Sequence, residues 1–175
     1  ERVVAIQRKP LQNCLAIDIA CGCGAFLFSL ADYLHSHCEL SYREAVQRLY
    51  GVDISELSVN RCKILLSLAA LLNNEMLVDE DFHISQGNSL EFDFTTMPRV
   101  VENGGFDIVV GNPPYVRAKH IDDESKVLLS RWQVARCGNA DLYLPFFEIA
   151  CGILREDGVL GYITLNSFFK SVNAR

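Results

Sequence analysis

The sequence lacks any long uninterrupted apolar run. Its longest apolar stretches, such as residues 64–72, are broken by Ser67 and are much shorter than the ~20 residues that a membrane-spanning helix needs. No stretch at the start has the pattern of a secretory signal. We therefore expect a chain that makes no contact with a membrane and is located in the cytoplasm.

Paired cysteine motifs are also missing. The seven cysteines stand at positions 14, 21, 23, 38, 62, 137 and 151, without a Cys-x-x-Cys pair, which favours reduced thiols over a disulfide framework. His35, His37 and Cys38 form a compact group of metal-binding side chain types. They lie at the expected end of a helix without a matching second half, so we predict a solvated helix terminus and no metal site.

Positive charge is scarce. The net charge is −6 and the isoelectric point is near 5.2, which gives no support to a broad nucleic-acid footprint on this segment. A stand-alone DNA-binding protein is therefore disfavoured, whereas a catalytic domain whose basic surface lies elsewhere stays open. With 175 residues, half of them hydrophobic, the chain suits one domain over residues 1–175 with a sizeable core.

The apolar pattern alternates between strand and helix. Residues 15–18 form a short apolar run, after which apolar residues recur at helical spacing at Leu27, Leu30, Ala31 and Leu34. Residues 48–55 repeat the pattern, since Ser55 can cap a helix. In that second helix one face is shared by Leu57, Ile64, Leu68 and Leu72.

The second half of the chain continues the alternation. Residues 81–90 and 106–111 have the composition of a third and a fourth strand. Residues 116–140 have no sustained apolar spacing and predict a partly helical excursion over the active face. A further helix has Pro145 in its first turn and is marked by Phe146, Ile149, Ala150 and Ile153. Asp157-Gly158 then predicts a turn into a fifth strand over residues 159–165.

Strands that alternate with helices predict a doubly wound α/β fold, with a mostly parallel sheet and helices on both faces. In such sheets, ligands bind beyond the carboxyl ends of the strands. The unusual residues of this chain follow four predicted strands, in the segments 18–24, 87–89 and 112–115 and at Asp53. We therefore expect four loops to converge on one crevice.

One half of this crevice has the features of a nucleotide-cofactor site. Gly22 and Gly24 allow a tight turn and a close approach of the backbone to a ligand. The dinucleotide fingerprint needs a third glycine where Leu27 stands, which disfavours NAD. Asp53 ends the second strand, where a carboxylate can bind both hydroxyls of a ribose or start a helix. Asn88 could contact an adenine edge, and turn formation explains it equally well.

The other half holds the run Asn112-Pro113-Pro114-Tyr115. The nitrogen of a conjugated amino group is a poor nucleophile because its lone pair is delocalised. The Asn112 side-chain oxygen and the Pro113 carbonyl could accept its two hydrogens, while Tyr115 offers a face for stacking. The prolines stiffen the loop and remove competing N–H donors. This run therefore predicts catalysis at a planar amino group.

Taken in order, these segments resemble the S-adenosylmethionine-dependent DNA methyltransferases that modify adenine N6 in restriction-modification systems. The resemblance runs from about Leu15 to Phe169 and includes "DIACGCGAFL", "GVDIS", "GNSL", "NPPY" and "DLYLPFFEIACGILREDGVLGYITLNSFF". It implies a catalytic role for Asn112, Pro113, Pro114 and Tyr115. It implies cofactor contacts from Asp18, Ala20, Cys21, Gly22, Gly24, Asp53, Ile54, Asn88, Ser89 and Asn112.

The sequence departs from the family pattern at two positions and in its extent. Asn88 stands where an aspartate is usual, and Ile19 replaces a common proline. The family also continues beyond the fifth strand into a target-recognition domain, so the chain is expected to be a fragment. The resemblance implies double-stranded DNA as the partner of the full-length protein, with a nuclease or specificity subunit as a further partner. It also implies that the target adenine is flipped out of the duplex.

Other functions fit parts of the pattern. The Asn-Pro-Pro-Tyr run suits any planar amide or amino nitrogen, including a protein glutamine side chain or an RNA base. The domain could also be a non-catalytic cofactor-binding module, although its intact Asn112, Pro113 and Tyr115 argue against decay. A NAD-dependent oxidoreductase is a third alternative. Cys21 and Cys23 are expected to be packing residues of the first loop, because methyl transfer to nitrogen needs no covalent enzyme intermediate.

Overall fold

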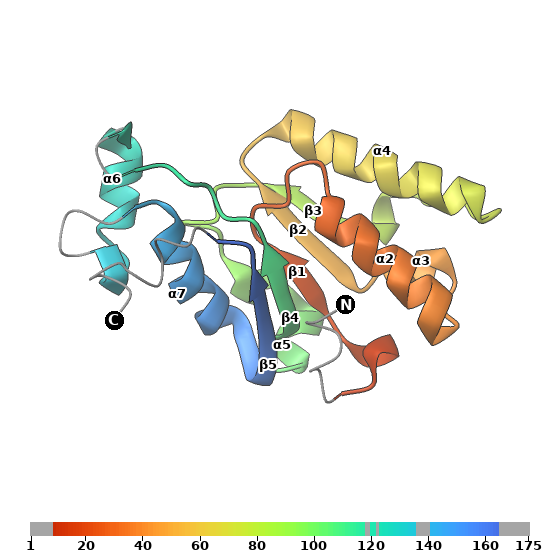
Figure 1. The fold of residues 1–175 in the computed structure, drawn as a ribbon. Helices are drawn as coiled ribbons and strands as arrows, with labels where there is room; N and C mark the ends of the chain where they lie inside the picture. Colours follow the sequence, from red (N-terminus) through yellow and green to blue (C-terminus); the bar gives the residue numbers. More distant parts are fainter. Residues whose placement is uncertain (1–8, 118–119, 122, 136–140, 165–175) are drawn as a thin grey trace.

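The computed structural model describes residues 9–117, 120–121, 123–135 and 141–164. Five strands form one sheet in which every pairing is parallel, in the order β3-β2-β1-β4-β5 (Figure 1). The strands are β1 (Ala16–Asp18), β2 (Leu49–Asp53), β3 (His83–Gln86), β4 (Phe106–Gly111) and β5 (Leu154–Tyr162). The predicted doubly wound α/β fold is confirmed.

Helices connect the strands on both faces of the sheet. The helices are α2 (Ala25–Cys38), α3 (Tyr42–Val46), α4 (Glu56–Leu72), α5 (Pro98–Glu102), α6 (Asp123–Leu129) and α7 (Tyr143–Ile153), with short 3-10 turns at Leu11–Asn13, Asp79–Asp81, Phe94–Thr96 and Gln133–Ala135. The chain runs outward from β1 through β2 to β3, then returns to the other side of β1 at β4. This reversal beside β1 is the position where doubly wound sheets bind ligands.

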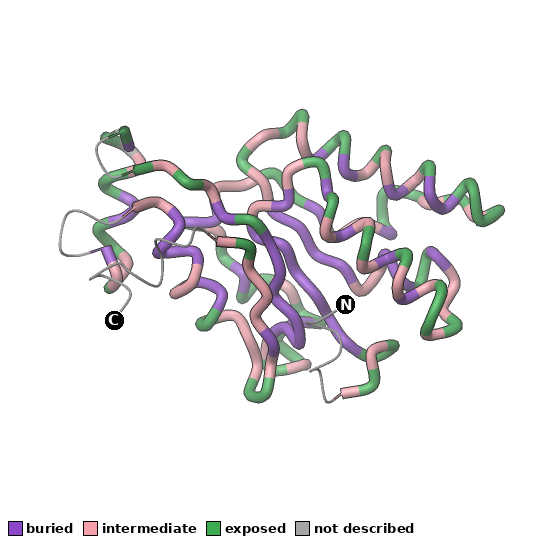
Figure 2. The backbone as a smooth tube through the Cα atoms, viewed as in Figure 1, coloured by how far each residue is buried: buried purple, intermediate pink, exposed green. Residues whose placement is uncertain are grey.

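Strand residues alternate between two cores, one on each face. Ile17 and Val109 pack with α5 and α7, whereas Ala16 and Ile108 pack with α2, α3 and α4. Figure 2 shows the central strands buried along their length, with exposed residues on the outer sides of the helices. Strands buried on both faces are the reason that β1 and β4 have almost purely apolar sequences.

Helix α4 departs from the expectation in one respect. Ser55 caps it by accepting a hydrogen bond from the Ser58 N–H, and its four predicted apolar residues do share a face. That face is turned to solvent, because Leu57, Ile64 and Leu68 each expose more than half of their surface. The helix packs on the sheet side through different residues, Val59, Cys62, Leu66, Ala69 and Ala70.

Helix α3 was not predicted, although its start has a sequence signal. Ser41 and Glu44 form a capping box, in which the Ser41 side chain accepts from the Glu44 N–H and the Glu44 carboxylate accepts from the Ser41 N–H. The excursion over residues 116–140 is partly helical, as expected, with α6 and a 3-10 turn among its described residues. Pro145 lies in the first turn of α7, also as expected.

The fifth strand begins earlier than predicted. Leu154 already pairs with Phe106 of β4, and the register then shifts before Val159 pairs with Ile108. Asp157, at a φ of 62°, and Gly158 lie within this irregularity. The Asp157-Gly158 pair was predicted to form a turn before the fifth strand. It instead lies at a bulge within β5. The third strand is shorter than expected, because residues 81–82 and 87–90 lie outside β3.

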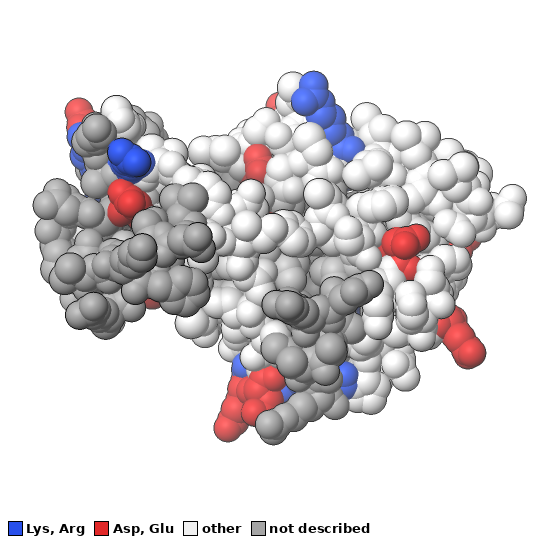
Figure 3. Space-filling model, viewed as in Figure 1, with Lys and Arg blue, Asp and Glu red and all other residues white. Residues whose placement is uncertain are grey.

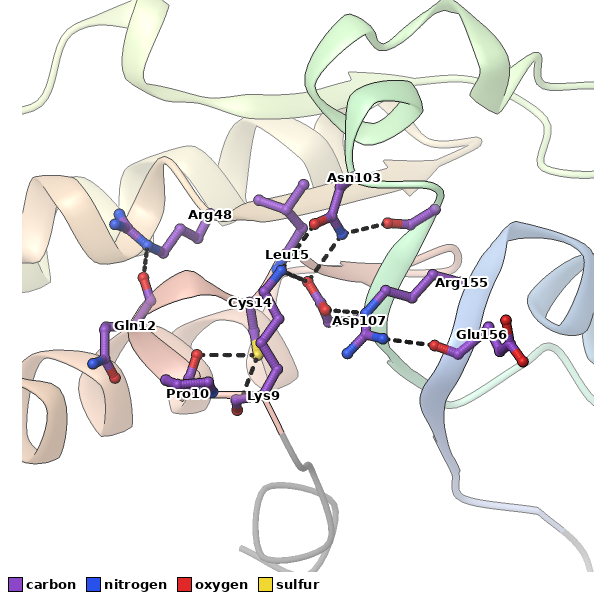
Figure 4. A network of polar contacts seen from close by, with 11 residues as sticks. Lys9, Pro10, Gln12, Cys14, Leu15, Arg48, Asn103, Asp107, Arg155 and Glu156 are labelled. Carbon is purple, nitrogen blue, oxygen red and sulfur yellow. Dashed lines mark hydrogen bonds and ion pairs between the residues drawn. The ribbon is translucent and has the colours of Figure 1, made fainter.

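A buried carboxylate ties the strands together at the amino end of β4 (Figure 4). Asp107 is fully buried, accepts a hydrogen bond from the Leu15 N–H at 2.7 Å, and forms ion pairs with Arg155 and with Lys9. Burial alone would raise its pKa, but the hydrogen bonds from Leu15, Arg155 and Lys9 hold the pKa of Asp107 below its usual value. This network joins β1, β4 and β5 away from the ligand end of the sheet.

His35, His37 and the cysteines of the described ranges show no sign of a metal site or a disulfide. His35 and His37 hydrogen-bond through Nδ1 to the carbonyls of Leu40 and Tyr33 at the end of α2. Within the described ranges, no group of three or more histidine, cysteine, aspartate or glutamate side chains could hold a metal ion. The six cysteines in these ranges are free thiols, and Cys137 lies outside them. None of the helices in the described part is long and apolar enough to cross a bilayer.

Candidate active site

A cavity of about 290 Å³ lies at the carboxyl ends of the central strands. Its volume is near the lower limit of typical ligand pockets, ~300–1,000 Å³. The lining residues come from the loops after β1, β2, β3 and β4 and from α6 and α7: Ile19, Ala20, Asp53, Ile54, Gly87, Asn88, Ser89, Leu90, Asn112, Pro114, Ser125, Leu142 and Phe146. The expected convergence of four loops on one crevice is therefore present.

Asp18 stands at the end of β1 and does not border this cavity. It is buried, and its Oδ1 accepts a hydrogen bond from the Ala20 N–H at 2.9 Å. Burial raises the pKa of Asp18 to about 7, the Ala20 hydrogen bond opposes this rise, and the charge of Asp53 adds to it. A cation near this carboxylate would favour its ionised form. Binding of a cation at neutral pH would therefore release a proton from Asp18.

The first loop turns through two glycines in the left-handed region. Gly22 has a φ of 53° and Gly24, which precedes α2, has a φ of 85°. A Cβ on Gly24 would lie 2.2 Å from the Cys62 sulfur on α4, so only glycine fits there. Cys21 is buried, and both its hydrogen bond with Cys62 and its burial raise the pKa of its thiol. Cys21 is thus buried as expected of a packing residue, whereas Cys23, for which the same was expected, is exposed.

Asp53 joins the first loop to the second. Its Oδ2 accepts from the Gly22 N–H at 2.8 Å, and its Oδ1 accepts from the Ser55 N–H at 2.9 Å. Each carboxylate oxygen can accept more than one hydrogen bond, and Asp53 and Ile54 both border the cavity. Asp53 can therefore accept from the backbone at the start of α4 and still bind hydroxyl groups of a ligand. The two interpretations of this residue are compatible.

The turn after β3 is held to the loop after β1. The buried Ser89 hydroxyl donates to the Ile19 carbonyl oxygen at 2.5 Å. The Asn88 side-chain oxygen accepts from the Leu90 N–H at 3.1 Å and so closes the turn. The amide NH₂ of Asn88 is the group that remains for a ligand, which makes Asn88 a donor where an aspartate would only accept.

The Asn-Pro-Pro-Tyr run follows β4 and forms the other side of the cavity. Asn112 is exposed and Pro113 is buried, while Asn112 and Pro114 border the cavity. The Tyr115 hydroxyl lies 2.5 Å from Asn112 Oδ1 and 2.6 Å from the Ile163 carbonyl oxygen. The Tyr115 ring lies 6.2 Å from the ring of Tyr143, centroid to centroid. The side-chain oxygen predicted to bind a substrate amino group is thus contacted by Tyr115 here.

The structure brings most of the predicted residues to one cavity but not all of them. Asp18, Cys21, Gly22, Gly24, Pro113 and Tyr115 do not border it. Sequence reasoning missed Ser125, Leu142 and Phe146 as cavity residues. The placement of residues 116–140 over the active face was the available signal for Ser125, whereas Phe146 was interpreted only as a core residue of its helix.

The same fold recurs in solved structures. The complex of DrdV with DNA has a TM-score of 0.70 at 18% identity, over 98% of this chain and 20% of that one. The precorrin 8W decarboxylase of Methanobacterium thermoautotrophicum has a TM-score of 0.51 at 16% identity, over 99% of this chain and 66% of that one. The strand order and these matches define the fold as the Rossmann-like fold of S-adenosylmethionine-dependent methyltransferases.

Within this class, the chain belongs to the Eco57I restriction-modification methylase family, whose profile matches residues 47–175. It is similar to the type II restriction enzyme and methyltransferase RM.Eco57I of Escherichia coli, with 30% identity over 87% of this chain and 20% of that protein. It is 27% identical to the adenine-specific methyltransferase PglX of Streptomyces coelicolor, over 95% of this chain and 18% of that protein. The chain thus spans about a fifth of the length of these relatives.

Proposed function

We propose that this chain is the catalytic domain of a DNA methyltransferase that transfers a methyl group from S-adenosylmethionine to adenine N6 in a restriction-modification system. The observation that supports it most is the shared cavity, which brings Asp53 and Asn88 to face Asn112 and Pro114. Family membership and the adenine-specific relative PglX favour the same substrate. Double-stranded DNA is the proposed partner of the full-length protein, through a target-recognition domain outside this chain.

The donors and acceptors around the cavity suit this cofactor. Asp53 has acceptor capacity left for the two hydroxyls of a ribose, and the Asn88 NH₂ can donate to a ring nitrogen of an adenine. Ile54 and Leu90 supply apolar surface on which an adenine can pack. When bound, S-adenosylmethionine supplies an electrophilic methyl group on a sulfonium. Asp18 and Gly22 support this half indirectly, through their hydrogen bonds to the cavity residues Ala20 and Asp53, while Cys21 and Gly24 belong to the same loop.

The second half of the cavity orients the amino group. Asn112 Oδ1 and the Pro113 carbonyl accept the two N6 hydrogens, so that the nitrogen lone pair points along the line of attack. Pro114 stiffens the loop, and Tyr115 stacks on the base after its hydroxyl leaves Asn112. Positioning of this kind contributes on the order of 7–11 kcal/mol to a bimolecular reaction. No side chain needs to act as a nucleophile.

The test is a methyl-incorporation assay with the whole gene product that carries this domain. Duplex DNA, RNA and glutamine-containing protein are offered in parallel, and the modified DNA is digested to identify the methylated base. N6-methyladenine in duplex DNA is the expected product. Incorporation only into RNA or protein would overturn the choice of substrate, and absence of incorporation into all three would favour a non-catalytic binding module.

A further inference from the structure

Helix α4 is apolar on two opposite faces. Its inner face buries residues such as Val59 and Leu66 against the sheet. On its outer face, five large apolar residues expose between 54% and 86% of their surface: Leu57, Ile64, Leu68, Leu71 and Leu72. A surface helix normally has a polar outer face, and a helix that is apolar all round is normally covered on all sides. The outer face of α4 therefore has the composition of a covered surface.

The spacing on this outer face indicates what kind of element covers it. Leu57, Arg61, Ile64, Leu68 and Leu71 follow one another at alternating intervals of four and three residues. This is the spacing with which helices pack side by side along their length. The side chains of a strand or a loop do not follow this spacing, so they would not match an apolar stripe that extends along four helical turns. The spacing therefore favours a helix as the occupant.

A groove beside the stripe strengthens this inference. It lies between α2 and α4, has a volume of about 240 Å³, and is lined by Phe28, Asp32, Tyr42, Leu65, Leu68, Ala69, Leu72 and Asn73. The Tyr42 hydroxyl is buried and has no hydrogen-bond partner among the described residues. Buried polar groups are nearly always satisfied in folded proteins. Tyr42 has no exposed surface, so an occupant can satisfy this hydroxyl only after the side chains that line the groove move aside.

Charge around the groove adds a further requirement. In Figure 3 the surface over α2 and α4 carries few charged side chains. Asp32 is exposed at the groove, and burial and then the charge of Asp32 raise the pKa of Tyr42 to about 12. Arg61 is the only charged residue within the stripe. A complementary helix would present apolar side chains, a basic residue near Asp32 and an acidic residue near Arg61.

We propose that the α2–α4 face docks an apolar helix that belongs to the polypeptide outside this domain in the full-length protein. The length of the relatives supports this occupant, because this chain spans only 20% of RM.Eco57I and 18% of PglX. Each of them therefore has about four times as much additional chain that could cover such a face. The docking helix seats its apolar stripe along α4 and brings a hydrogen-bonding group to Tyr42.

The experiment compares the whole gene product with the 175-residue chain by carbene footprinting, with molar mass measured by light scattering. The 175-residue chain is expected to be monomeric and to be labelled strongly at Ile64, Leu68 and Leu72. The same residues in the whole protein are expected to be labelled at least tenfold less. Equal labelling in the two proteins would overturn the proposal. So would a 175-residue dimer with a protected α4, since a second copy would then be the occupant.

Variants separate docking from folding. Leu68→Asp is expected to lower the melting temperature of the 175-residue chain by only a few degrees, because Leu68 is exposed, and to restore labelling of Ile64 in the whole protein. Val101→Asp is the matched control, since Val101 is an exposed apolar residue on α5, and it should leave Ile64 protected. Unchanged protection of Ile64 in Leu68→Asp would contradict the docking site.

Tyr42→Phe tests the base of the groove. Removal of a hydroxyl without a partner is expected to maintain or raise the melting temperature of the 175-residue chain. In the whole protein the same change is expected to increase labelling of Leu68, because the docked helix loses a hydrogen bond. The contact with Tyr42 would be overturned if Tyr42→Phe raised the melting temperature equally in both proteins and left Leu68 protected. The occupant would then not reach Tyr42.

Discussion

The Tyr115 hydroxyl lies 2.5 Å from Asn112 Oδ1 and 2.6 Å from the Ile163 carbonyl oxygen. Both neighbours are acceptors, and the hydroxyl has one hydrogen to share between them. In the proposed function, Asn112 Oδ1 receives a hydrogen of the substrate amino group. Tyr115 therefore competes with the substrate for this acceptor until its hydroxyl moves away.

Tyr115→Phe should bind an extrahelical adenine more tightly than the native enzyme does. It keeps the ring for stacking and removes a competing hydrogen bond worth ~0.5–1.5 kcal/mol, which corresponds to roughly a two- to tenfold gain. Tyr115→Ala should bind more weakly by ~1–3 kcal/mol, because base stacking is lost. The measurement is the affinity of the whole protein for duplex DNA with a fluorescent base at the target position. Equal losses in both variants would refute the competition.

Asn112→Ala should abolish methyl transfer and leave cofactor affinity within a few-fold of the native value. The proposed partner of Asn112 Oδ1 is the substrate amino group, so its loss affects orientation of that group and not the cofactor half of the cavity. Single-turnover kinetics and titration calorimetry of the same protein separate the two effects. Native turnover by Asn112→Ala would remove it from catalysis.

Asp53→Ala should weaken binding of S-adenosylmethionine by ~1–3 kcal/mol, the scale of a lost charged hydrogen bond. The change also frees the Gly22 and Ser55 N–H groups, so the melting temperature needs to be measured alongside. Asp53→Asn is the control, because its one remaining oxygen can still accept. Calorimetry with S-adenosylmethionine and with NAD should detect binding of the first only, and an unaltered affinity in Asp53→Ala would exclude the carboxylate from the site.

Asp18 should make the ligand-free domain less stable as the pH rises from about 4 to 7. Its pKa in the folded state is about 7, above the ordinary value of ~3.9 for an unfolded chain. Over this interval the unfolded chain holds fewer protons than the folded one, so stability falls with rising pH. Asp18→Asn should remove this slope. Melting temperatures of the two proteins across this interval test the prediction, and parallel curves would contradict it.

Arg155→Met should destabilise the domain by roughly 1.5–3 kcal/mol, the scale of a lost hydrogen bond to a charged group, because the buried Asp107 carboxylate keeps Lys9 and the Leu15 N–H as partners. The pKa of Asp107 is lowered in the fold, so its contribution to stability is present above the unfolded pKa and is lost as the pH falls through the folded one. The difference between native and variant should therefore shrink in acid. Lys126→Met, which breaks the exposed pair with Asp123, is the control and should cost less than ~1 kcal/mol.

Local sequence was sufficient for the elements that carry the cavity. The alternation of apolar runs and helical spacing correctly predicted β1, β2 and β4, because strands buried on both faces must be apolar throughout. Ser55 and Pro145 correctly marked helix starts, since capping and the missing proline N–H act within one turn. The convergence of four loops followed from the parallel topology alone.

Other features depend on tertiary contacts that a single sequence does not specify. The apolar stripe of α4 was recognised, but the sequence could not reveal that the stripe faces solvent, because the opposite face is apolar as well. The bulge at Asp157 arises from the register between β4 and β5. Ser125 borders the cavity from a segment that has no periodic pattern to read, and the helical spacing of Phe146 predicted its burial but not its place at the cavity.

The hydrogen bond from Ser89 to Ile19 and the bond from Gly22 to Asp53 connect loops that follow three different strands. These hydrogen bonds hold the loops against one another, which lowers the conformational entropy that is lost when the first half of the cavity is filled. In the proposed function, the second half exchanges the Tyr115–Asn112 contact for a contact with the base. Such an asymmetry favours an ordered kinetic scheme, in which the small ligand enters a preorganised pocket first and the slower adjustment around Asn112 governs entry of the second.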